Sequence, residues 1–427
     1  MKVSVITALD IGSSFVRALI GQYNTDGKME IKGIGEVVSD GMDKGLVKDI
    51  QAVSLCVKKA LEMAEGIAEL KAENVFINIT GEHIRCVSVI GRISVSGHLS
   101  NEPAEITPEH INQVINDAKN SIKTQKGFER LQILHGLPQY YDIDDQNEIY
   151  NPINMTGYHL TAHVLLILAD ITSIRNLLRC VEVAGYSVEP GHIVLSHIAA
   201  GLSTLSEDER KLGAVVIDVG GGCCDIAFYN KGNLIQTYVV PMAGNNITRD
   251  LAIGLRTTIG NAENVKVEHG NALSEGLDPN QEINVDGISG RSSLTYKIAH
   301  VSLIIQSRLN EFMETCYQHI KSAYPPELIT AGIILSGGSA KLNGIDSFVS
   351  NLFNMPVKTA VPDISRLCGP ISRFHDSSFC TVIGLLYYGM DFYRESLYSA
   401  PAGKTKSRKA DKGLLTRLGQ YVKEFFS

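Results

Sequence analysis

The alternation of apolar and polar positions near the start of the chain predicts a β-hairpin over residues 4–23. An apolar run leads into Asp10 and Gly12, and apolar residues then occupy every second position. This period of two on both sides of a glycine turn is typical of paired antiparallel strands. The pattern returns at residues 215–229, where an apolar run leads through Asp218 into Gly220.

Aligning Asp10 with Asp218 also aligns Gly12 with Gly220. We interpret this as a weak internal repeat, which suggests two similar halves that each contribute a strand, a turn and a strand. Coincidence between two ordinary glycine hairpins is the alternative interpretation.

Other elements follow from capping residues and periodicity. Thr107 is an N-cap before Pro108, which predicts a helix that continues to about Ile122. Residues 131–158 are rich in turn formers, which suggests an inserted small domain over 83–162. Helical periodicity predicts helices at 171–183 and from 294 to about 324, and the second leads into a strand at 331–335.

Composition narrows the classes of protein. The 427 residues are 44% apolar, enough to bury substantial cores. The net charge of −7 argues against binding nucleic acid over the whole surface. Eight scattered cysteines without a C-x-x-C pair indicate reduced thiols rather than zinc or thioredoxin chemistry. We expect no signal peptide and no spanning helix, so any contact with a membrane must be peripheral.

The glycine turns have the composition of a phosphate site. Bound triphosphate needs inward-pointing N–H groups, close backbone approach, and carboxylates near the metal ion. The first turn offers Gly12, Ser13 and Ser14, with Asp10 holding magnesium through water. The second offers Gly220, Gly221 and Gly222, with Asp218 facing the same ion.

A third loop, Gly337-Gly338-Ser339, follows an apolar strand and is suited to backing an adenosine. Single glycine loops after strands are usually only turns. Three such loops in one chain, two of them preceded by an acidic residue, favour a nucleotide site. The chain has no G-x-x-x-x-G-K-[ST] segment, so it is not a P-loop protein.

These loops resemble the ATPase fold shared by actin, heat-shock chaperones and sugar kinases. The resemblance implies two α/β lobes around a cleft that takes ATP with magnesium. Residues 241–245 and 262–270 look like parts of the mobile upper domain of the second lobe, which adds Gly244 and Asn245 to the phosphate site. In that family such a segment reaches the ribose and adenine, a role that would fall to Glu263 and Lys266. The alternative for these two residues is a solvated helix face.

Within this superfamily the chain resembles FtsA over nearly its whole length. The matching segments are residues 8–14, 194–210, 218–222, 266–272 and 331–339. The resemblance implies an actin-like division protein that self-assembles, recruits the tubulin-like FtsZ and later division proteins, and attaches to the cytoplasmic side of the cell membrane. In the family the inserted domain serves self-assembly and downstream partners, and the upper domain of the second lobe binds FtsZ.

The resulting fold class is an α/β, actin-like two-lobed fold with an inserted small domain and a C-terminal amphipathic helix. The expected segments are first-lobe core at 1–82 and 163–205, the inserted domain at 83–162, second-lobe core at 206–240 and 301–395, the upper domain at 241–300, a basic linker at 396–412 and the membrane helix at 413–427.

The last segment has the pattern of an interfacial helix. At 100° per residue its apolar side chains share an arc of about 140°, with basic residues outside it. The predicted membrane residues are Leu414, Leu415, Leu418, Tyr421, Val422, Phe425 and Phe426, with the cations Lys412, Arg417 and Lys423. The basic linker would attract anionic lipid. A helix docked on the protein's own core is the alternative.

Hydrolysis is expected to be slow or absent, so the protein is not primarily an enzyme. Actin-like ATPases use a Gln or Glu to orient the attacking water, whereas this chain has Ser196-His197 in that region. His197 is better explained as a packing residue. The adjacent Cys223 and Cys224 are not expected to form a disulfide. Two other functions stay open: a soluble ATPase or kinase of the same fold, and a pilus-assembly relative. Neither explains the amphipathic tail.

Overall fold

The computed structural model describes residues 5–25, 27–95, 102–123 and 125–398. The chain forms two compact units. The first contains Met1–Glu82, Asn176–Gly232 and Thr237–Gly389, and the second contains His83–Arg175, Asn233–Gln236 and the chain from Met390. Each is described separately.

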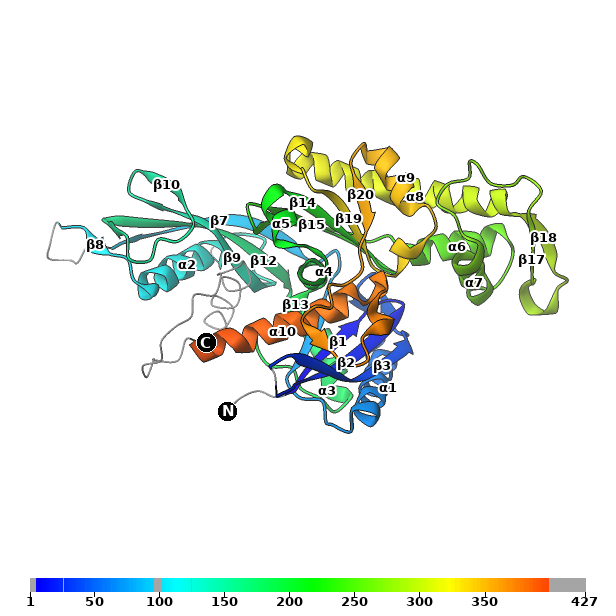
Figure 1. Cartoon of the computed structure of the whole chain (residues 1–427), viewed down its shortest axis with the longest axis horizontal. Coiled ribbons are helices and arrows are strands. Elements are labelled where there is room, and N and C mark those ends of the chain that lie inside the picture. Colours follow the sequence, from blue (N-terminus) through cyan, green and yellow to red (C-terminus); the bar gives the residue numbers. More distant parts are fainter. Residues whose placement is uncertain (1–4, 26, 96–101, 124, 399–427) are drawn as a thin grey trace. The chain divides into compact units, whose positions relative to one another are not determined.

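The first unit holds two larger sheets, which we call the first-lobe and second-lobe sheets (Figure 1), and two short strand pairs. The first-lobe sheet has the order β13-β6-β1-β2-β3-β21. Its strands are β1 (Val5–Ile11), β2 (Phe15–Tyr23), β3 (Met29–Val38), β6 (Val75–Ile79), β13 (Ile193–Leu195) and β21 (Leu367–Cys368). A short hairpin, β4 (Met42–Asp43) and β5 (Leu46–Val47), follows β3.

Helix α1 (Ile50–Ala68) begins at Asp49, whose carboxylate accepts hydrogen bonds from the N–H groups of Gln51 and Ala52. It lies against β3 at two glycines. A Cβ on Gly33 or Gly35 would come within 2.0 or 1.9 Å of a carbonyl oxygen of α1. The missing side chains therefore allow the close approach of helix and strand.

Helix α10 (Cys380–Tyr398) also covers the first-lobe sheet, although it comes late in the chain. A Cβ on Gly389 would lie 2.7 Å from the Ile6 side chain and 2.9 Å from the Phe76 ring. β21 pairs with β3 in parallel. The prediction that residues 301–395 all belong to the second lobe is therefore wrong for β21 and for the part of α10 around Gly389. Between them, Ser377 and Thr381 do hydrogen-bond Gly337 and Asp218 of the second lobe.

The second-lobe sheet has the order β16-β15-β14-β19-β20. Its strands are β14 (Ala214–Val219), β15 (Cys224–Asn230), β16 (Asn233–Val240), β19 (Gly332–Ser336) and β20 (Val357–Thr359). The associated elements are α4 (Ser196–Thr204), α5 (Glu207–Leu212), α6 (Gly244–Gly254), α7 (Ile259–His269), β17 (Glu282–Val285), β18 (Leu294–Lys297), α8 (Ile298–Ala323) and α9 (Ile345–Phe353).

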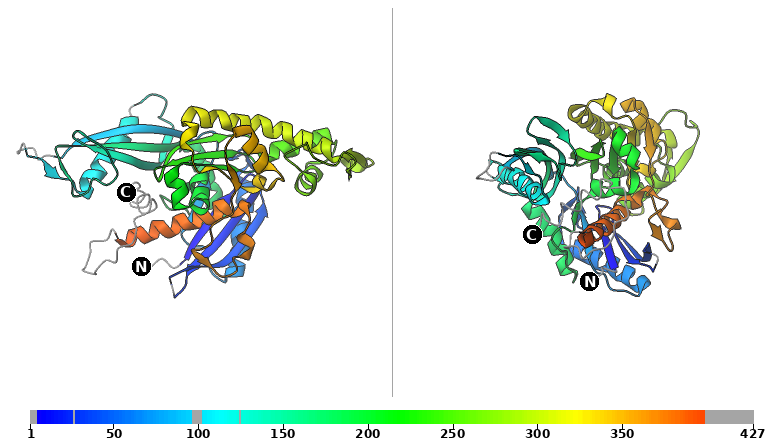
Figure 2. Two further views of the ribbon diagram at one scale, coloured as in Figure 1. Left: turned by 45° about the horizontal axis from the view of Figure 1, so that its top comes forward. Right: turned by 60° about the vertical axis from the view of Figure 1, so that its left-hand side comes forward.

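The second unit is a four-stranded antiparallel sheet with one amphipathic helix on it, seen from two more sides in Figure 2. Its elements are β7 (Arg85–Ser94), α2 (Pro108–Lys123), β9 (Leu131–Ile143), β10 (Gln146–Ile149) and β12 (His159–Asp170), with the short pair β8 (Ala104–Glu105) and β11 (Thr156–Gly157). Helix α2 buries Ile111, Val114 and Ile115. α3 (Ile171–Val183) follows β12 directly.

Both predicted hairpins, the helices at 108–122 and 171–183, and the strand near 331–335 are confirmed. The turn-rich interpretation of 131–158 is wrong over β9, a strand of 13 residues. Its register against β12 shifts beside Pro138, so an irregularity in the ladder accommodates a residue that sheets usually exclude. The long helix begins at Ile298 rather than Leu294, because residues 294–297 pair with β17.

Three expected boundaries fall inside elements. Residue 162 lies within β12, which stays paired with β7 and β9 beyond it. Residue 300 lies within α8, and residue 396 lies within α10. In each case the strand or helix continues across the position where the sequence suggested a boundary.

Candidate functional site

The two predicted glycine turns have the same backbone geometry. Gly12 N–H donates to the carbonyl of Phe15 at 3.0 Å, and Gly220 N–H donates to the carbonyl of Cys223 at 3.0 Å. A Cβ on Gly12 would lie 2.9 Å from that oxygen, and one on Gly220 would lie 3.1 Å from its own. The internal repeat is thus a structural one: each hairpin closes with a four-residue turn that needs glycine first.

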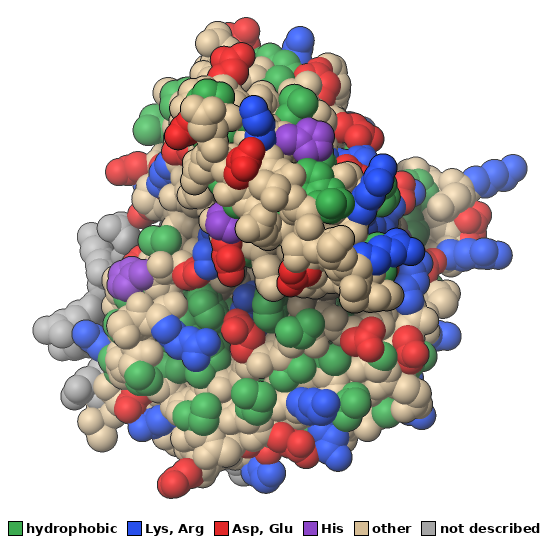
Figure 3. All heavy atoms as spheres, turned by 90° about the vertical axis from the view of Figure 1, so that its right-hand side faces the viewer, with side chains coloured by type: hydrophobic (Ala, Val, Ile, Leu, Met, Phe, Trp, Pro, Cys, Tyr) green, Lys and Arg blue, Asp and Glu red, His purple; other side chains and the backbone are tan. Residues whose placement is uncertain are grey.

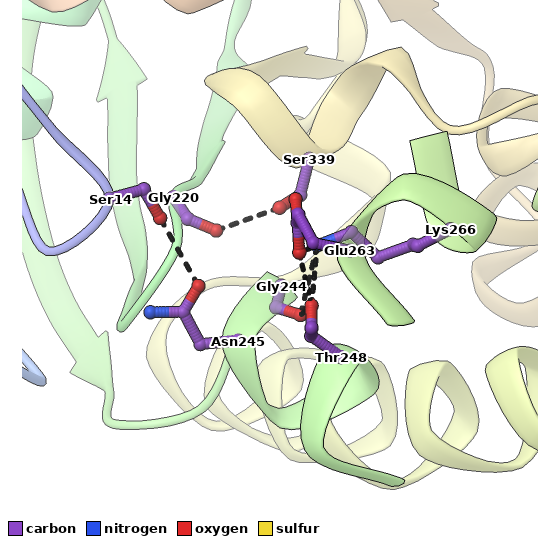
Figure 4. A network of polar contacts seen from close by, with 8 residues as sticks. All are labelled: Ser14, Gly220, Gly244, Asn245, Thr248, Glu263, Lys266 and Ser339. Atoms are coloured by element: carbon purple, nitrogen blue, oxygen red, sulfur yellow. Dashed lines mark hydrogen bonds and ion pairs between the residues drawn. The ribbon is translucent and has the colours of Figure 1, made fainter. Parts of the chain in front are cut away.

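The turns face each other closely. A Cβ on Gly221 would lie 2.0 Å from Ser14 Oγ, and one on Gly222 would lie 2.6 Å from Ser13 Oγ. Ser14 Oγ donates to Asn245 Oδ1 at 3.1 Å (Figure 4). Only glycine permits this spacing in the second turn.

The third loop and helix α6 meet the same turn. Ser339 Oγ donates to the carbonyl of Gly220 at 2.8 Å. The first N–H groups of α6, on Gly244 and Asn245, donate to the carbonyls of Gly220 and Gly221 at 3.2 and 2.8 Å. The three segments that the sequence singled out as glycine loops are therefore in contact.

A cavity of about 680 Å³ lies between them, within the range of small-molecule sites. Fourteen predicted site residues line it, and Gly244, which does not, donates its N–H to the carbonyl of Gly220 in the second turn. The lining residues are Asp10, Gly12, Ser13, Ser14, Asp218, Gly220, Gly221, Gly222, Asn245, Glu263, Lys266, Gly337, Gly338 and Ser339.

Two buried carboxylates end strands β1 and β14. Asp10 accepts a hydrogen bond from Asn78 Nδ2 at 2.7 Å, and Asp218 accepts from Ser336 Oγ and Thr381 Oγ1, each at 3.1 Å. Burial raises the pKa of Asp10 to about 7, opposed by Arg17 and increased by Asp218. Burial likewise raises the pKa of Asp218.

A third carboxylate, Asp225, lies in the same cavity and is 3% exposed. Thr80 Oγ1 donates to it at 2.5 Å. Burial, with repulsion from Asp218 and Asp10, raises its pKa to about 8. Buried acids that raise one another's pKa fit a divalent cation, which would relieve the repulsion. Among the described residues no three acidic, His or Cys side chains converge on one point.

Lys266 and Glu263 form a fixed pair on α7. Lys266 Nζ donates to Glu263 Oε2 at 2.7 Å, to Thr248 Oγ1 at 2.8 Å and to the Gly244 carbonyl at 3.3 Å (Figure 4). The Lys266 side chain is 12% exposed. A solvated helix face is therefore the wrong interpretation for Lys266, while Glu263 stays half exposed at the cavity.

The sequence reasoning missed several lining residues, among them Arg17, Asn78, Thr80 and Asp225. Arg17 pairs with Glu36 at 2.6 Å and lies 5.0 Å from the ring centres of Phe15 and Phe379. Strand register offers the missing signal. Arg17 is the cross-strand partner of Asp10, as Asp225 is of Asp218. Equivalent positions of the repeat thus carry opposite charges.

His197 does not face the cavity. It is fully buried in α4, and its Nε2 hydrogen-bonds Thr237 Oγ1. Its neighbour Ser196 lines the cavity and donates to the Ile79 carbonyl at 3.2 Å. The packing role expected for His197 is confirmed.

Other sequence predictions concern the rest of the chain. The predicted membrane residues, Lys412 to Phe426, lie outside the described residues. In the described part of the chain, no helix is long and apolar enough to cross a bilayer. All eight cysteines lie among the described residues, and none of them forms a disulfide. On the face drawn in Figure 3, acidic and basic side chains are interspersed rather than sorted into patches.

Solved structures share this fold. The PilM-PilN type IV pilus biogenesis complex matches with a TM-score of 0.65 at 13% identity, covering 91% of this chain and 99% of that one. MreB5 of Spiroplasma citri bound to ADP matches with a TM-score of 0.53 at 14% identity, covering 94% and 100%. The chain therefore has an actin-like fold, with two lobes around a shared cavity and a small domain inserted in the first lobe.

Family models and curated relatives go further. The model of the cell division protein FtsA matches residues 215–384, and that of the SHS2 domain inserted in FtsA matches 81–168. FtsA of Neisseria meningitidis is 34% identical over 99% of this chain and 98% of its own length. FtsA of Escherichia coli K12 is 31% identical with the same coverage. The chain belongs to the FtsA family of cell division proteins.

Proposed function

We propose that the protein binds ATP with magnesium in this cavity and uses the nucleotide as an assembly ligand in cell division. The observation that carries the proposal is the pair of matching turns, each ending a strand with a buried carboxylate and together framing a cavity of about 680 Å³. The MreB5 relative in fold is a complex with ADP, which supports the same class of ligand here.

Each set of residues has a distinct role. N–H groups of the two turns, with the Ser13 and Ser14 hydroxyls, take the phosphates, and the third loop with Glu263 and Lys266 takes the adenosine. Magnesium would lie near Asp10 and Asp218 and offset the charge of the phosphates and carboxylates. We propose slow hydrolysis, because the side chain of His197 is directed toward Thr237 instead of the cavity.

We further propose that the protein self-assembles into filaments and holds FtsZ at the cytoplasmic side of the cell membrane as a peripheral protein. The upper domain around α6, α7 and β17–β18 would bind FtsZ, and the SHS2 domain would serve self-assembly and later division proteins. Family membership supports these partners. The sequence pattern of residues 413–427, behind a basic segment, supports attachment to anionic lipid.

Co-sedimentation with anionic vesicles tests the attachment. The full chain is compared with a chain that ends at Gly403, at low and moderate salt. Leu418→Glu places a charge on the apolar arc, whereas Gln420→Glu places the same charge opposite it. We expect sedimentation of the full chain and Q420E only. If the full chain stays in solution, a soluble ATPase of the same fold becomes the better interpretation.

A further inference from the structure

The β4–β5 hairpin touches both phosphate turns. Its two central residues have positive φ, 50° at Lys44 and 73° at Gly45, which is the type I′ turn of a tight hairpin. Gly45 N–H donates to Ser13 Oγ of the first turn at 3.3 Å. A Cβ on Gly222 of the second turn would lie 2.9 Å from Lys44 N. The hairpin tip therefore lies where the two turns meet.

The tip lies at the end of the cavity away from the adenosine loop. Along the second turn, Gly220 contacts Ser339 of that loop, whereas Gly222 contacts Lys44. A nucleotide whose adenosine lies at the third loop, with its phosphates between the turns, directs its terminal phosphate toward the hairpin. Gly45 lines the cavity at this end.

Most cations of the cavity are already neutralised. Arg17 pairs with Glu36, Lys266 with Glu263, and Lys341 with Asp376, at 2.6, 2.7 and 2.6 Å. Lys44 itself is not one of the lining residues, but its neighbour Gly45 is, and among the described residues no acidic group pairs with the Lys44 ammonium.

The charge of Lys44 nevertheless acts on the second turn. Burial raises the pKa of the Cys223 thiol, Asp225 and Asp43 raise it further, and Lys44 opposes the rise. A lysine ammonium on a flexible four-carbon stem can be redirected at little cost.

Resting on the proposed function, we propose that the β4–β5 hairpin recognises the terminal phosphate of ATP. Lys44 supplies a charge-assisted hydrogen bond that ADP cannot accept, and the Gly45 N–H lies beside it. Asp43, the residue before Lys44, links the hairpin to the second lobe, because its carboxylate lies 3.5 Å from the guanidinium of Arg249 in α6. The hairpin thus discriminates ATP from ADP.

The chain contains its own matched control. Lys231-Gly232 forms the turn between β15 and β16 with the same dipeptide and the same positive φ, 49° and 83°, and a Cβ on Gly232 would meet nothing within 4 Å. Neither residue lines the cavity. Asn tolerates positive φ, so Lys44→Asn and Lys231→Asn remove one charge each without straining the turn.

The assay is displacement of a fluorescent ATP analogue by ATP or ADP from the full chain with magnesium. We expect K44N to weaken ATP about tenfold, the order expected for one charge-assisted hydrogen bond, and to leave ADP within about twofold. K231N should change neither affinity, and Lys44→Arg should restore most of the preference for ATP.

The results distinguish a failure of this proposal from a failure of the proposed function. If K44N binds both nucleotides as the wild type does, or loses ATP and ADP equally, the hairpin does not recognise the terminal phosphate. If the wild type binds neither nucleotide, the proposed function itself fails. Circular dichroism of each variant shows whether a loss of affinity reflects a loss of fold.

Discussion

Replacing Asp10 with asparagine tests whether the buried carboxylates destabilise the ligand-free protein. Burial raises the pKa of Asp10 from 3.8 to about 7, with Arg17 opposing the rise. Between these pH values the folded state keeps a proton that the unfolded chain has lost. The protonated Asp10 carboxyl therefore contributes to the free energy of unfolding fully below about pH 4, and this contribution is lost as the pH rises to about 7. Each pH unit corresponds to about 1.4 kcal/mol, so the loss is at most about 4 kcal/mol.

Asp10→Asn removes the ionisation and keeps an oxygen that can accept from Asn78 Nδ2. We therefore expect the variant to be more stable than the wild type at pH 8 and similar to it at pH 4. At roughly 2–4 °C per kcal/mol for a domain of this size, the gain at pH 8 is several degrees in Tm. Thermal unfolding without nucleotide, in a chelator, measures it.

Asp145→Asn, at an exposed position of the β9–β10 turn, is the control and should leave Tm unchanged at both pH values. Magnesium with ATP should reverse the order at pH 8, because the wild type gains the ligand's stabilisation. Equal shifts of the D10N variant at pH 4 and pH 8, or no shift at pH 8, would refute the reasoning.

Three further outcomes follow from the same contacts. Gly221→Ala places a Cβ 2.0 Å from Ser14 Oγ, so ATP affinity should fall at least about tenfold in the displacement assay, whereas Gly66→Ala, on an open helix face, should leave it unchanged. Gly384→Ala places a Cβ 1.7 Å from the Ala199 carbonyl and should cost about 1–3 kcal/mol of stability, seen as a lower Tm; an unaltered Tm would contradict the packing of α10. Asp225→Asn should stabilise the ligand-free protein at pH 9 but not at pH 4, since the pKa of Asp225 rises to about 8, and equal effects at both pH values would exclude this cause.

Local patterns predicted the parts of the site that lie on strand ends. The alternation of apolar and polar residues around glycine turns predicted both hairpins. The need for carboxylates near a bound metal ion then assigned Asp10 and Asp218 to the same site. These inferences needed only near neighbours in the chain, because a turn and its flanking strands are specified within about twenty residues.

The residues that were missed come from distant segments. Asn78 is a polar residue in a buried strand, and Thr381 lies in the first turn of α10, a helix that follows the whole second-lobe sheet in the chain. Nothing near either residue marks it as part of a site. Asp225 and Arg17 were accessible in principle, since strand register pairs them with the two predicted carboxylates. The boundaries at 162 and 396 failed for a different reason: composition changes there, whereas β12 and α10 continue.

The late return of the chain to the first-lobe sheet has a consequence for synthesis. β21 and α10 supply the sheet's last strand and one of its covers, and they leave the ribosome after more than 360 residues have been made. Until then Ile6 and Phe76 lack the helix that buries them, and the edge of β3 lacks β21. The nascent first lobe thus exposes apolar surface and an unpaired strand edge until these segments are made, the condition in which chaperones are needed. The lobe that is begun first is completed last.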